Sequence, residues 1–173
     1  MDTIKTERLE LRPMCEDFLD STHEYASDPV TCRYMMFLPH ESREETMEFL
    51  TDSVNEFAKE DPSFYEMAVF YEGNHVGAVS LYLTEDRKTA EFGWIINKKY
   101  QGLGIAPEAA KGLLKYASEH LGIKHFVAHC DTANEPSMKV MDKLCMTRVK
   151  ESGGRFNRGS SEERREYKYE IWV

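Results

Sequence analysis

The segment from Tyr100 to Ala110, with the sequence YQGLGIAPEAA, places two glycines just before the start of a predicted helix. The first turn of a helix has unpaired backbone N–H groups and partial positive charge. Gly102 and Gly104 have no Cβ atom, so an anion can approach the main chain closely there. Two hypotheses fit the segment: an ordinary turn between a strand and a helix, or a phosphate-binding loop. It is neither a dinucleotide fingerprint, because Pro107 takes the place of the third glycine, nor a P-loop, because no G-K-[ST] follows.

No metal chemistry is predicted. The four cysteines are widely spaced and contain no C-x-x-C pair, which favours free buried thiols in a reducing compartment over disulfides or zinc ligands. His129 lies in the strand-like run HFVAHCD, and a single histidine in a strand is usually structural.

Composition limits the class of protein and of partner. The chain has 173 residues, 41% of them hydrophobic and 31% charged, which is typical of one folded domain over residues 1–173. Neither a secretory signal nor an apolar run near the ~20 residues of a membrane span is visible, so no membrane association and a cytoplasmic location are predicted. The net charge of −9 argues against nucleic-acid binding and weakly favours cationic partners such as amines.

The predicted elements give an α+β fold with mixed strand directions. RLELRP suggests a first strand, and three strand-like runs, FYEMAVFY, HVGAVSLYL and TAEFGWIIN, suggest an antiparallel meander. HFVAHCD and EYKYEIWV suggest two later strands. Helices are predicted over residues 17–26, after Ser42, over residues 107–121 and in NEPSMKVMDKLC. The glycine- and charge-rich segment 151–166 is predicted to be a mobile loop.

The helix after Ser42 is marked by its cap and its apolar spacing. Ser42 and Glu45 form a capping-box pattern. The apolar residues that follow recur at helical spacing and predict one buried stripe; they are Met47, Leu50, Val54, Phe57 and Ala58.

Three ordered segments together resemble GNAT N-acetyltransferases of the RimJ/RimL-type branch. They are TERLELRPM, AEFGWIINKKYQGLGIAPEAAKGLLKYA and ANEPSMKVMDKL. Within the second, Gln101, Gly104 and Ala106 occupy the positions of the family's Q/R-x-x-G-x-G/A motif. The resemblance covers nearly the whole chain and implies a mostly antiparallel sheet, flanked by helices, in which one pair of strands splays apart to hold the cofactor.

This resemblance implies acetyl-CoA as co-substrate, no metal, and a set of coenzyme-binding residues. The backbone amides of the glycine loop would hold the pyrophosphate, and the strand before the loop would pair with the pantetheine arm in the manner of strand addition. A backbone N–H of that strand would also polarise the thioester carbonyl. The implied binding residues are Trp94, Ile95, Ile96, Gln101, Gly102, Leu103, Gly104, Ile105, Ala106 and Asn134.

The resemblance also implies direct transfer of an acetyl group to a primary amine. Glu91 is the candidate base, acting directly or through water, and its alternative is a solvated strand glutamate. Ser137 resembles the serine that protonates the leaving thiolate in this branch, although a serine in a first helical turn often only caps. Met141 stands where many relatives carry a tyrosine, so Ser137, water and another residue all remain candidates for the acid.

The acceptor site of this fold is built by the early helices and variable loops, here around residues 33–40 and the late loop. The acceptor would be a protein N-terminus or a small cationic amine. The competing hypotheses are a non-catalytic CoA-binding sensor on the same fold and a module that binds ordinary nucleotides through the glycine loop. A homodimer is common among such relatives, and nothing in the sequence demonstrates one.

Overall fold

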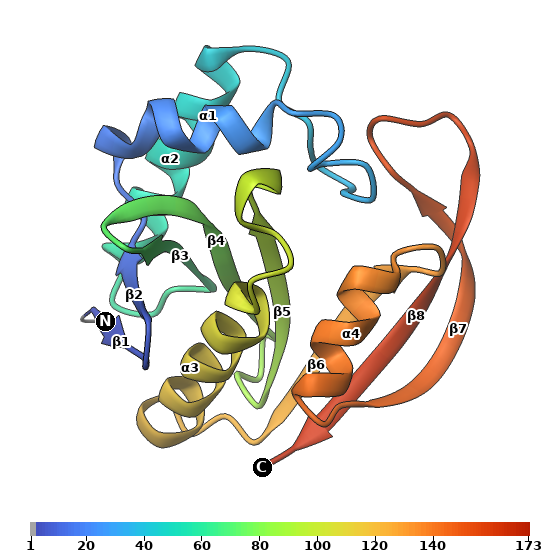
Figure 1. The fold of residues 1–173 in the computed structure, drawn as a ribbon. Coiled ribbons are helices and arrows are strands. Elements are labelled where there is room, and N and C mark those ends of the chain that lie inside the picture. Colours follow the sequence, from blue (N-terminus) through green and yellow to red (C-terminus); the bar gives the residue numbers. More distant parts are fainter. Residues whose placement is uncertain (1–2) are drawn as a thin grey trace.

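The computed structural model describes residues 3–173, which form one eight-stranded sheet with helices on both faces (Figure 1). The strand order is β1-β2-β3-β4-β5-β6-β8-β7. The strands are β1 (Ile4–Lys5), β2 (Leu9–Pro13), β3 (Phe64–Tyr71), β4 (Asn74–Leu83), β5 (Thr89–Ile96), β6 (His125–Asp131), β7 (Thr147–Phe156) and β8 (Glu163–Trp172). The helices are α1 (Leu19–Ala26), α2 (Arg43–Phe57), α3 (Ile105–His120) and α4 (Glu135–Lys143), with 3-10 turns at Glu16–Phe18 and Lys98–Tyr100.

The sheet is mostly antiparallel, as predicted, and β3, β4 and β5 form the expected meander. Its one parallel pair within the described residues joins β5 to β6, at the middle of the sheet. The turn between β3 and β4 consists of Glu72 and Gly73, both with positive φ, which matches the right-handed twist of a two-residue hairpin. The crossover from β5 to β6 runs through α3, so the glycine loop lies directly beyond the end of β5.

Each face of the sheet has its own apolar cluster, because strand side chains alternate between faces. Leu11, Met67, Phe92 and Phe126 point to the face covered by α3 and α4, which lie in front of the sheet in Figure 1. The opposite face packs against α1 and α2 through a smaller cluster; its buried members are Met14, Tyr25, Ala26, Cys32, Leu50, Ala68, Phe70, Ala78 and Ile95.

The predicted cap of α2 is confirmed, whereas the predicted apolar stripe is only partly right. Ser42 Oγ accepts a hydrogen bond from the Glu45 amide at 3.2 Å. Leu50 is fully buried, but Val54 is exposed, and the polar residues Thr46 and Ser53 are buried instead. Thr46 is accommodated because its hydroxyl pairs with the ring nitrogens of two histidines.

None of the helices in residues 3–173 is long and apolar enough to cross a membrane.

The loop predicted over residues 151–166 is wrong, because most of this segment belongs to the β7–β8 hairpin. β7 is an edge strand, and nearly all of its residues are exposed. A strand exposed on both faces has no alternating apolar pattern to reveal it. Gly153 and Gly154 fall where the β7–β8 register shifts, between Ser152 and Arg155, so these glycines mark an irregularity within a strand.

A buried polar network ties the hairpin to β6. The Asp131 carboxylate is fully buried and accepts hydrogen bonds from the Arg164 guanidinium, at 3.1 Å, and from Asn157 Nδ2, at 2.7 Å. From the same hairpin, Arg155 donates to the Tyr34 carbonyl at 2.8 Å, and Arg158 donates to the Phe37 carbonyl at 3.1 Å. The hairpin is thereby joined to the loop between α1 and α2.

Candidate active site

The glycine loop turns the chain from β5 into α3 with a left-handed backbone. Gly102 has φ +81° and Gly104, the N-cap residue of α3, has φ +77°. Residues with a side chain rarely adopt such φ values, which explains why glycine occupies both positions. A Cβ atom on Gly102 would meet nothing within 4 Å, so the main chain there borders open space. The predicted helix start at Pro107 is two residues late, because α3 begins at Ile105.

Five consecutive backbone amides of this loop have no protein acceptor. Within residues 3–173, the N–H groups of residues 102 to 106 donate to no backbone or side-chain oxygen, and Gly104 supplies no side-chain cap. Buried or not, such donors are satisfied by water or by a ligand. Five free donors beside the positive end of a sixteen-residue helix are suited to an anion of pyrophosphate size.

The loop is held rigidly at both ends. Gln101 Nε2 donates to the Ile96 carbonyl at 2.9 Å, which fixes the loop to the end of β5. Arg8 Nη1 donates to the Leu103 carbonyl at 3.1 Å, and the Arg8 guanidinium also pairs with Glu108 at 2.7 Å. Burial alone would raise the pKa of Glu108, but hydrogen bonds from Thr6 and Arg8 outweigh it and lower that pKa. Sequence reasoning missed Arg8, whose partners lie about a hundred positions away in the chain.

β5 continues beyond the point where its pairing with β6 ends. The parallel ladder joins Thr89–Phe92 to His125–Ala128, whereas β5 runs on to Ile96 and β6 to Asp131. Trp94, Ile95 and Ile96 lie beyond the last pair. Trp94 and Ile96 pack on the α3 face, and Ile95 packs on the α1 face. The β6-facing edge of this part of β5 thus has main-chain groups that no neighbouring strand pairs.

Glu91 and His129 meet at the last rungs of that ladder. Glu91 is half exposed on β5, and its Oε1 lies 2.9 Å from His129 Nδ1 on β6. Its neighbours on the same face are Gly93 on β5 and Tyr82, its register partner on β4. Phe92, the next residue along β5, is buried on the opposite face, as strand alternation requires. The prediction did not include His129 as a partner.

Glu66, on β3, is a buried carboxyl that sequence reasoning did not single out. It is 6% exposed, and its closest partner is the Tyr82 hydroxyl, which donates at 3.4 Å. Among residues 3–173 no cationic side chain forms an ion pair with it. Burial raises the pKa of Glu66 to about 8. The charge of Glu66 in turn raises the pKa of Tyr82, and a Cβ on Gly93 would come within 2.4 Å of Ser80 Oγ, beside this group.

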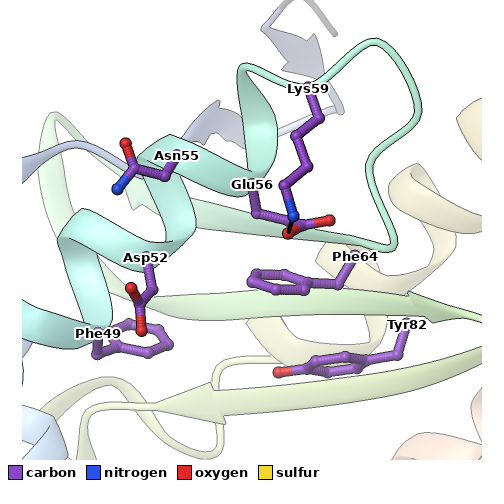
Figure 2. Close-up of a pocket in the computed structure, with 7 residues that line it drawn as sticks. All are labelled: Phe49, Asp52, Asn55, Glu56, Lys59, Phe64 and Tyr82. Carbon is purple, nitrogen blue, oxygen red and sulfur yellow. Dashed lines mark hydrogen bonds and ion pairs between the residues drawn. The ribbon is translucent and has the colours of Figure 1, made fainter.

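A cavity of about 390 Å³ opens next to Tyr82, between α2 and the ends of β3 and β4. Figure 2 shows Asp52 and Phe49 on one side of it and the rings of Phe64 and Tyr82 on the other. These two rings lie 5.5 Å apart at an angle of 31°. Among residues 3–173, Asp52 has no hydrogen-bond or ion-pair partner. Aromatic faces and a free carboxylate attract a cation.

Ser137 and Asn134 lie together at the start of α4. The Asn134 side chain accepts a hydrogen bond from the Ser137 amide at 3.2 Å and so caps α4. The Ser137 side chain is mostly buried, and its hydroxyl makes no hydrogen bond to the described residues. Met141 is fully buried in the core of the same face. A buried methionine has no proton to donate. The proton donors that remain at this end of α4 are the Ser137 hydroxyl and water.

No group of three or more histidine, cysteine, aspartate or glutamate side chains in residues 3–173 is arranged to hold a metal ion. His125 and His129 are four residues apart, a spacing that joins two ligands on a helix. They lie on a strand, where four residues span about 13 Å.

A sequence profile described as "Acetyltransferase (GNAT) domain" matches residues 8–147. The chain belongs to the GNAT acetyltransferase family. It is 29% identical over 147 residues to the uncharacterized N-acetyltransferase YnaD of Bacillus subtilis, covering 84% of this chain and 82% of that protein. It is 27% identical over 137 residues to the spermidine N(1)-acetyltransferase of Escherichia coli, covering 79% of this chain and 71% of that protein.

The GNAT fold is also evident among solved structures. RimL, a ribosomal L7/L12 alpha-N-protein acetyltransferase solved with coenzyme A, superposes with a TM-score of 0.89 at 19% identity, covering 99% of this chain and 98% of that one. The predicted α+β fold and the resemblance to the RimJ/RimL-type branch are confirmed. The protein is an N-acetyltransferase of the GNAT family, and coenzyme A is bound in a structural neighbour of it.

The buried Glu66 carboxyl predicts an unusual pH dependence of stability. An unfolded glutamate has a pKa of about 4.3, whereas the folded value is about 8, so the folded state binds the extra proton between these values. The free energy of unfolding therefore falls as pH rises through this window. We expect Glu66→Gln to remove that fall. The free energy of unfolding of the variant, relative to that of the wild type, should therefore rise by about 2–5 kcal/mol from pH 5 to pH 9.

Urea unfolding of both proteins at a series of pH values measures this difference. The exposed Glu48→Gln variant is the control and should follow the wild type throughout. A constant difference between Glu66→Gln and the wild type from pH 5 to pH 9 would contradict the prediction.

Proposed function

We propose that residues 1–173 act as one acetyltransferase domain that transfers the acetyl group of acetyl-CoA directly to the primary amine of a small cationic acceptor. The observation that carries the proposal is the run of five free amides, residues 102 to 106, directly beyond the part of β5 that β6 does not pair. The amides suit the pyrophosphate, and the unpaired edge at Trp94, Ile95 and Ile96 suits an extended arm. Asn134 and Ser137 lie at the start of α4, just after the end of β6.

The chemistry assigned to the residues follows from their positions. A protonated amine must lose a proton before its nitrogen attacks the thioester carbon. Glu91 is a half-exposed carboxylate one residue before the last β5–β6 pair, and it takes part in that proton removal. When the C–S bond breaks, the Ser137 hydroxyl supplies a proton to the thiolate. A backbone N–H beyond Phe92 stabilises the developing negative charge on the carbonyl oxygen.

The acceptor is inferred from the charges on the acceptor face. Asp52 is unpaired within the described residues beside the aromatic cavity, and the net charge is −9. These features favour a cationic amine, and a relative is named as a spermidine acetyltransferase. A protein N-terminus, the acceptor named for RimL, is the alternative. Free cysteines throughout the described residues are in keeping with a cytoplasmic location.

An amine panel tests the proposal. The protein is incubated with acetyl-CoA and a diamine, a polyamine, a monoamine, an aminoglycoside or short peptides with free N-termini, while released thiol and product mass are followed. We expect turnover with the diamine or polyamine to exceed that with the monoamine at least tenfold. Thiol release at background across the panel would overturn the proposal and favour a CoA-binding sensor. Turnover on peptides alone would reassign the acceptor, and ATP binding as tight as CoA binding would favour a nucleotide-binding module.

The role of Ser137 gives a separate prediction. We expect Ser137→Ala to lower kcat about 10- to 100-fold, because general acid catalysis contributes at least this much, and to leave the KM for acetyl-CoA unchanged. Initial rates at saturating amine measure both constants. Ser118→Ala on α3, whose hydroxyl accepts from Lys124, is the control and should keep the wild-type rate. Wild-type kcat in Ser137→Ala would rule out Ser137 as the acid and leave water or another residue in that role.

A further inference from the structure

Two histidine–carboxylate pairs lie on one face of β6, and they differ in what their second nitrogen does. His129 Nδ1 lies 2.9 Å from Glu91 Oε1. Four residues earlier, His125 Nε2 lies 3.3 Å from Glu170 Oε2, while its Nδ1 lies 3.0 Å from the Thr89 hydroxyl. The His125 ring also stacks on Trp172 at 4.1 Å. His125 therefore has both nitrogens engaged and its ring covered, which is the environment of a structural histidine.

His129, in contrast, keeps one nitrogen free. Within residues 3–173, Nε2 of His129 has no hydrogen-bond partner. In the described residues, the only buried side-chain polar atoms without a hydrogen-bond partner are the Thr22 and Tyr25 hydroxyls, so His129 Nε2 is open to solvent. The His129 side chain is 25% exposed. Since Glu91 is acceptor-only when ionised, it fixes the tautomer with hydrogen on Nδ1 and a lone pair on Nε2.

The pair also lies where the two central strands part. Ala128 forms the last rung with Phe92, so His129 is the first residue of β6 beyond the shared ladder. Glu91 is one residue before that rung, and Gly93, one residue beyond it, carries no side chain of its own on this face, where Ser80 Oγ lies close above it. His129 therefore adjoins the unpaired edge of β5, where the proposed function puts the reacting thioester.

We propose that His129 Nε2 accepts the proton of the acceptor ammonium, directly or through one water, and that Glu91 is its positioning residue. The proposal rests on the proposed function. Imidazole is the better proton acceptor near neutral pH, since its reference pKa of about 6.5 lies closer to pH 7 than that of a carboxylate. The Glu91 carboxylate holds the ring by Nδ1 and stabilises the imidazolium.

The protons balance over the whole transfer. An ammonium gives one proton to His129, and the neutral amine forms the C–N bond. As the C–S bond breaks, the thiolate takes a proton from Ser137 or water, and the second proton lost by the new amide nitrogen replaces it on Ser137 or on the hydroxide left by that water. His129 returns its proton to solvent, so one proton is released for each acetyl group transferred.

The charged and titratable groups on the same face as His129 come from four other strands. Glu91 on β5 is in hydrogen-bond contact with the ring, and Lys168 on β8 is the register partner of His129. Glu170 on β8 is engaged by His125. Tyr82 and Glu66 stand one and two strands beyond Glu91. Neutralising Glu91 therefore removes the one carboxylate in hydrogen-bond contact with the ring.

His129→Asn is the decisive variant, because its amide can still donate to Glu91 from near the Nδ1 position while nothing replaces Nε2. We expect kcat/KM for the amine at pH 7 to fall at least 100-fold, with unchanged CoA affinity by calorimetry. The deficit should shrink as pH rises toward the pKa of the amine, where the acceptor is already neutral, and added imidazole should restore part of the rate.

His125→Asn is the matched control and should stay within threefold of the wild type. Glu91→Gln should retain more activity than His129→Asn, and it should weaken the preference of the His129 ring for the tautomer with hydrogen on Nδ1, as read by nitrogen NMR, because an amide can donate as well as accept. A His129→Asn rate within threefold of the wild type, or a deficit that does not change with pH, would overturn the proposal. If the wild type is active on the amine panel and His129→Asn gives such a result, only the role of His129 is contradicted. If the wild type is inactive on the panel, the proposed function itself is contradicted.

Discussion

Gly104→Val is expected to lower the affinity for coenzyme A at least 100-fold. Gly104 has φ +77°, a conformation that a β-branched residue can hold only with strain. A valine would move the backbone toward negative φ and rotate the neighbouring amides away from their common direction. Its Cβ would also lie 3.5 Å from Arg8 Nη2, so the larger side chain would displace the guanidinium that holds the Leu103 carbonyl. The five donors that we propose bind one anion would then be lost together.

Calorimetric titration with coenzyme A measures this effect, and Gly122→Val separates it from simple strain. Gly122 has φ +72° and, like Gly102, borders open space, but it lies beyond the C-terminal end of α3. Both variants should lose about 1–3 kcal/mol of stability. Only Gly104→Val should lose binding. Unaltered affinity in a folded Gly104→Val protein would show that the amides of this loop do not hold the coenzyme.

Asp131→Ala is expected to lower the free energy of unfolding by about 3–5 kcal/mol, the effect of removing one partner from a buried ion pair. The carboxylate is 0% exposed and accepts from Arg164, Asn157 and, at 2.8 Å, from the backbone amide of Ala133. Removing it leaves three donors unpaired around a small cavity. Because Arg164 is one-third exposed, water relieves part of this loss, which favours the lower end of the range.

The pH dependence of the same variant has a defined sign. Burial would raise the pKa of Asp131, but the hydrogen bonds from Arg164, Ala133 and Asn157 outweigh it and lower the pKa. A lowered folded pKa adds stability above the unfolded value of about 3.9, and this stability is lost as pH falls through the folded value. The gap between wild type and Asp131→Ala in urea unfolding should therefore be largest near pH 7 and shrink below pH 4.

An exposed ion pair on the β7–β8 hairpin, which Asp131 holds to β6, provides the control. Glu151→Ala breaks the pair with Arg165 and should change stability by less than about 1 kcal/mol. If Asp131→Ala proves no more harmful than Glu151→Ala, the network does not hold the hairpin.

The sequence was sufficient for those parts of the fold whose local pattern and tertiary role agree. The β3–β4–β5 meander was predictable because turn residues separate strands with apolar runs, and α4 because Asn134 and Pro136 mark its start. β7 was not predictable, since an exposed edge strand has no apolar periodicity. α2 was predicted with an incorrect buried stripe, because Thr46 is buried only through histidine partners that come from elsewhere in the chain.

The candidate site divides in the same way. The glycine loop is contiguous in sequence, so its residues and their role as a loop could be named in advance. Arg8, Glu66 and His129 gain their significance from partners on other strands or helices. Glu91 and His129 are 38 residues apart and meet only because β5 and β6 pair in parallel, in a register that no local pattern encodes.

The short ladder between β5 and β6 has a mechanical consequence. Four residue pairs join β1–β5 to β6–β8 there, whereas each adjoining pair of strands is joined by seven. A molecule seated along the strand ends beyond the fourth pair would touch both halves of the sheet and act as a clamp across this seam. Its binding energy would stabilise the sheet against separation of the two halves. The protein with this molecule bound would therefore resist separation of β5 from β6 more than the free protein does.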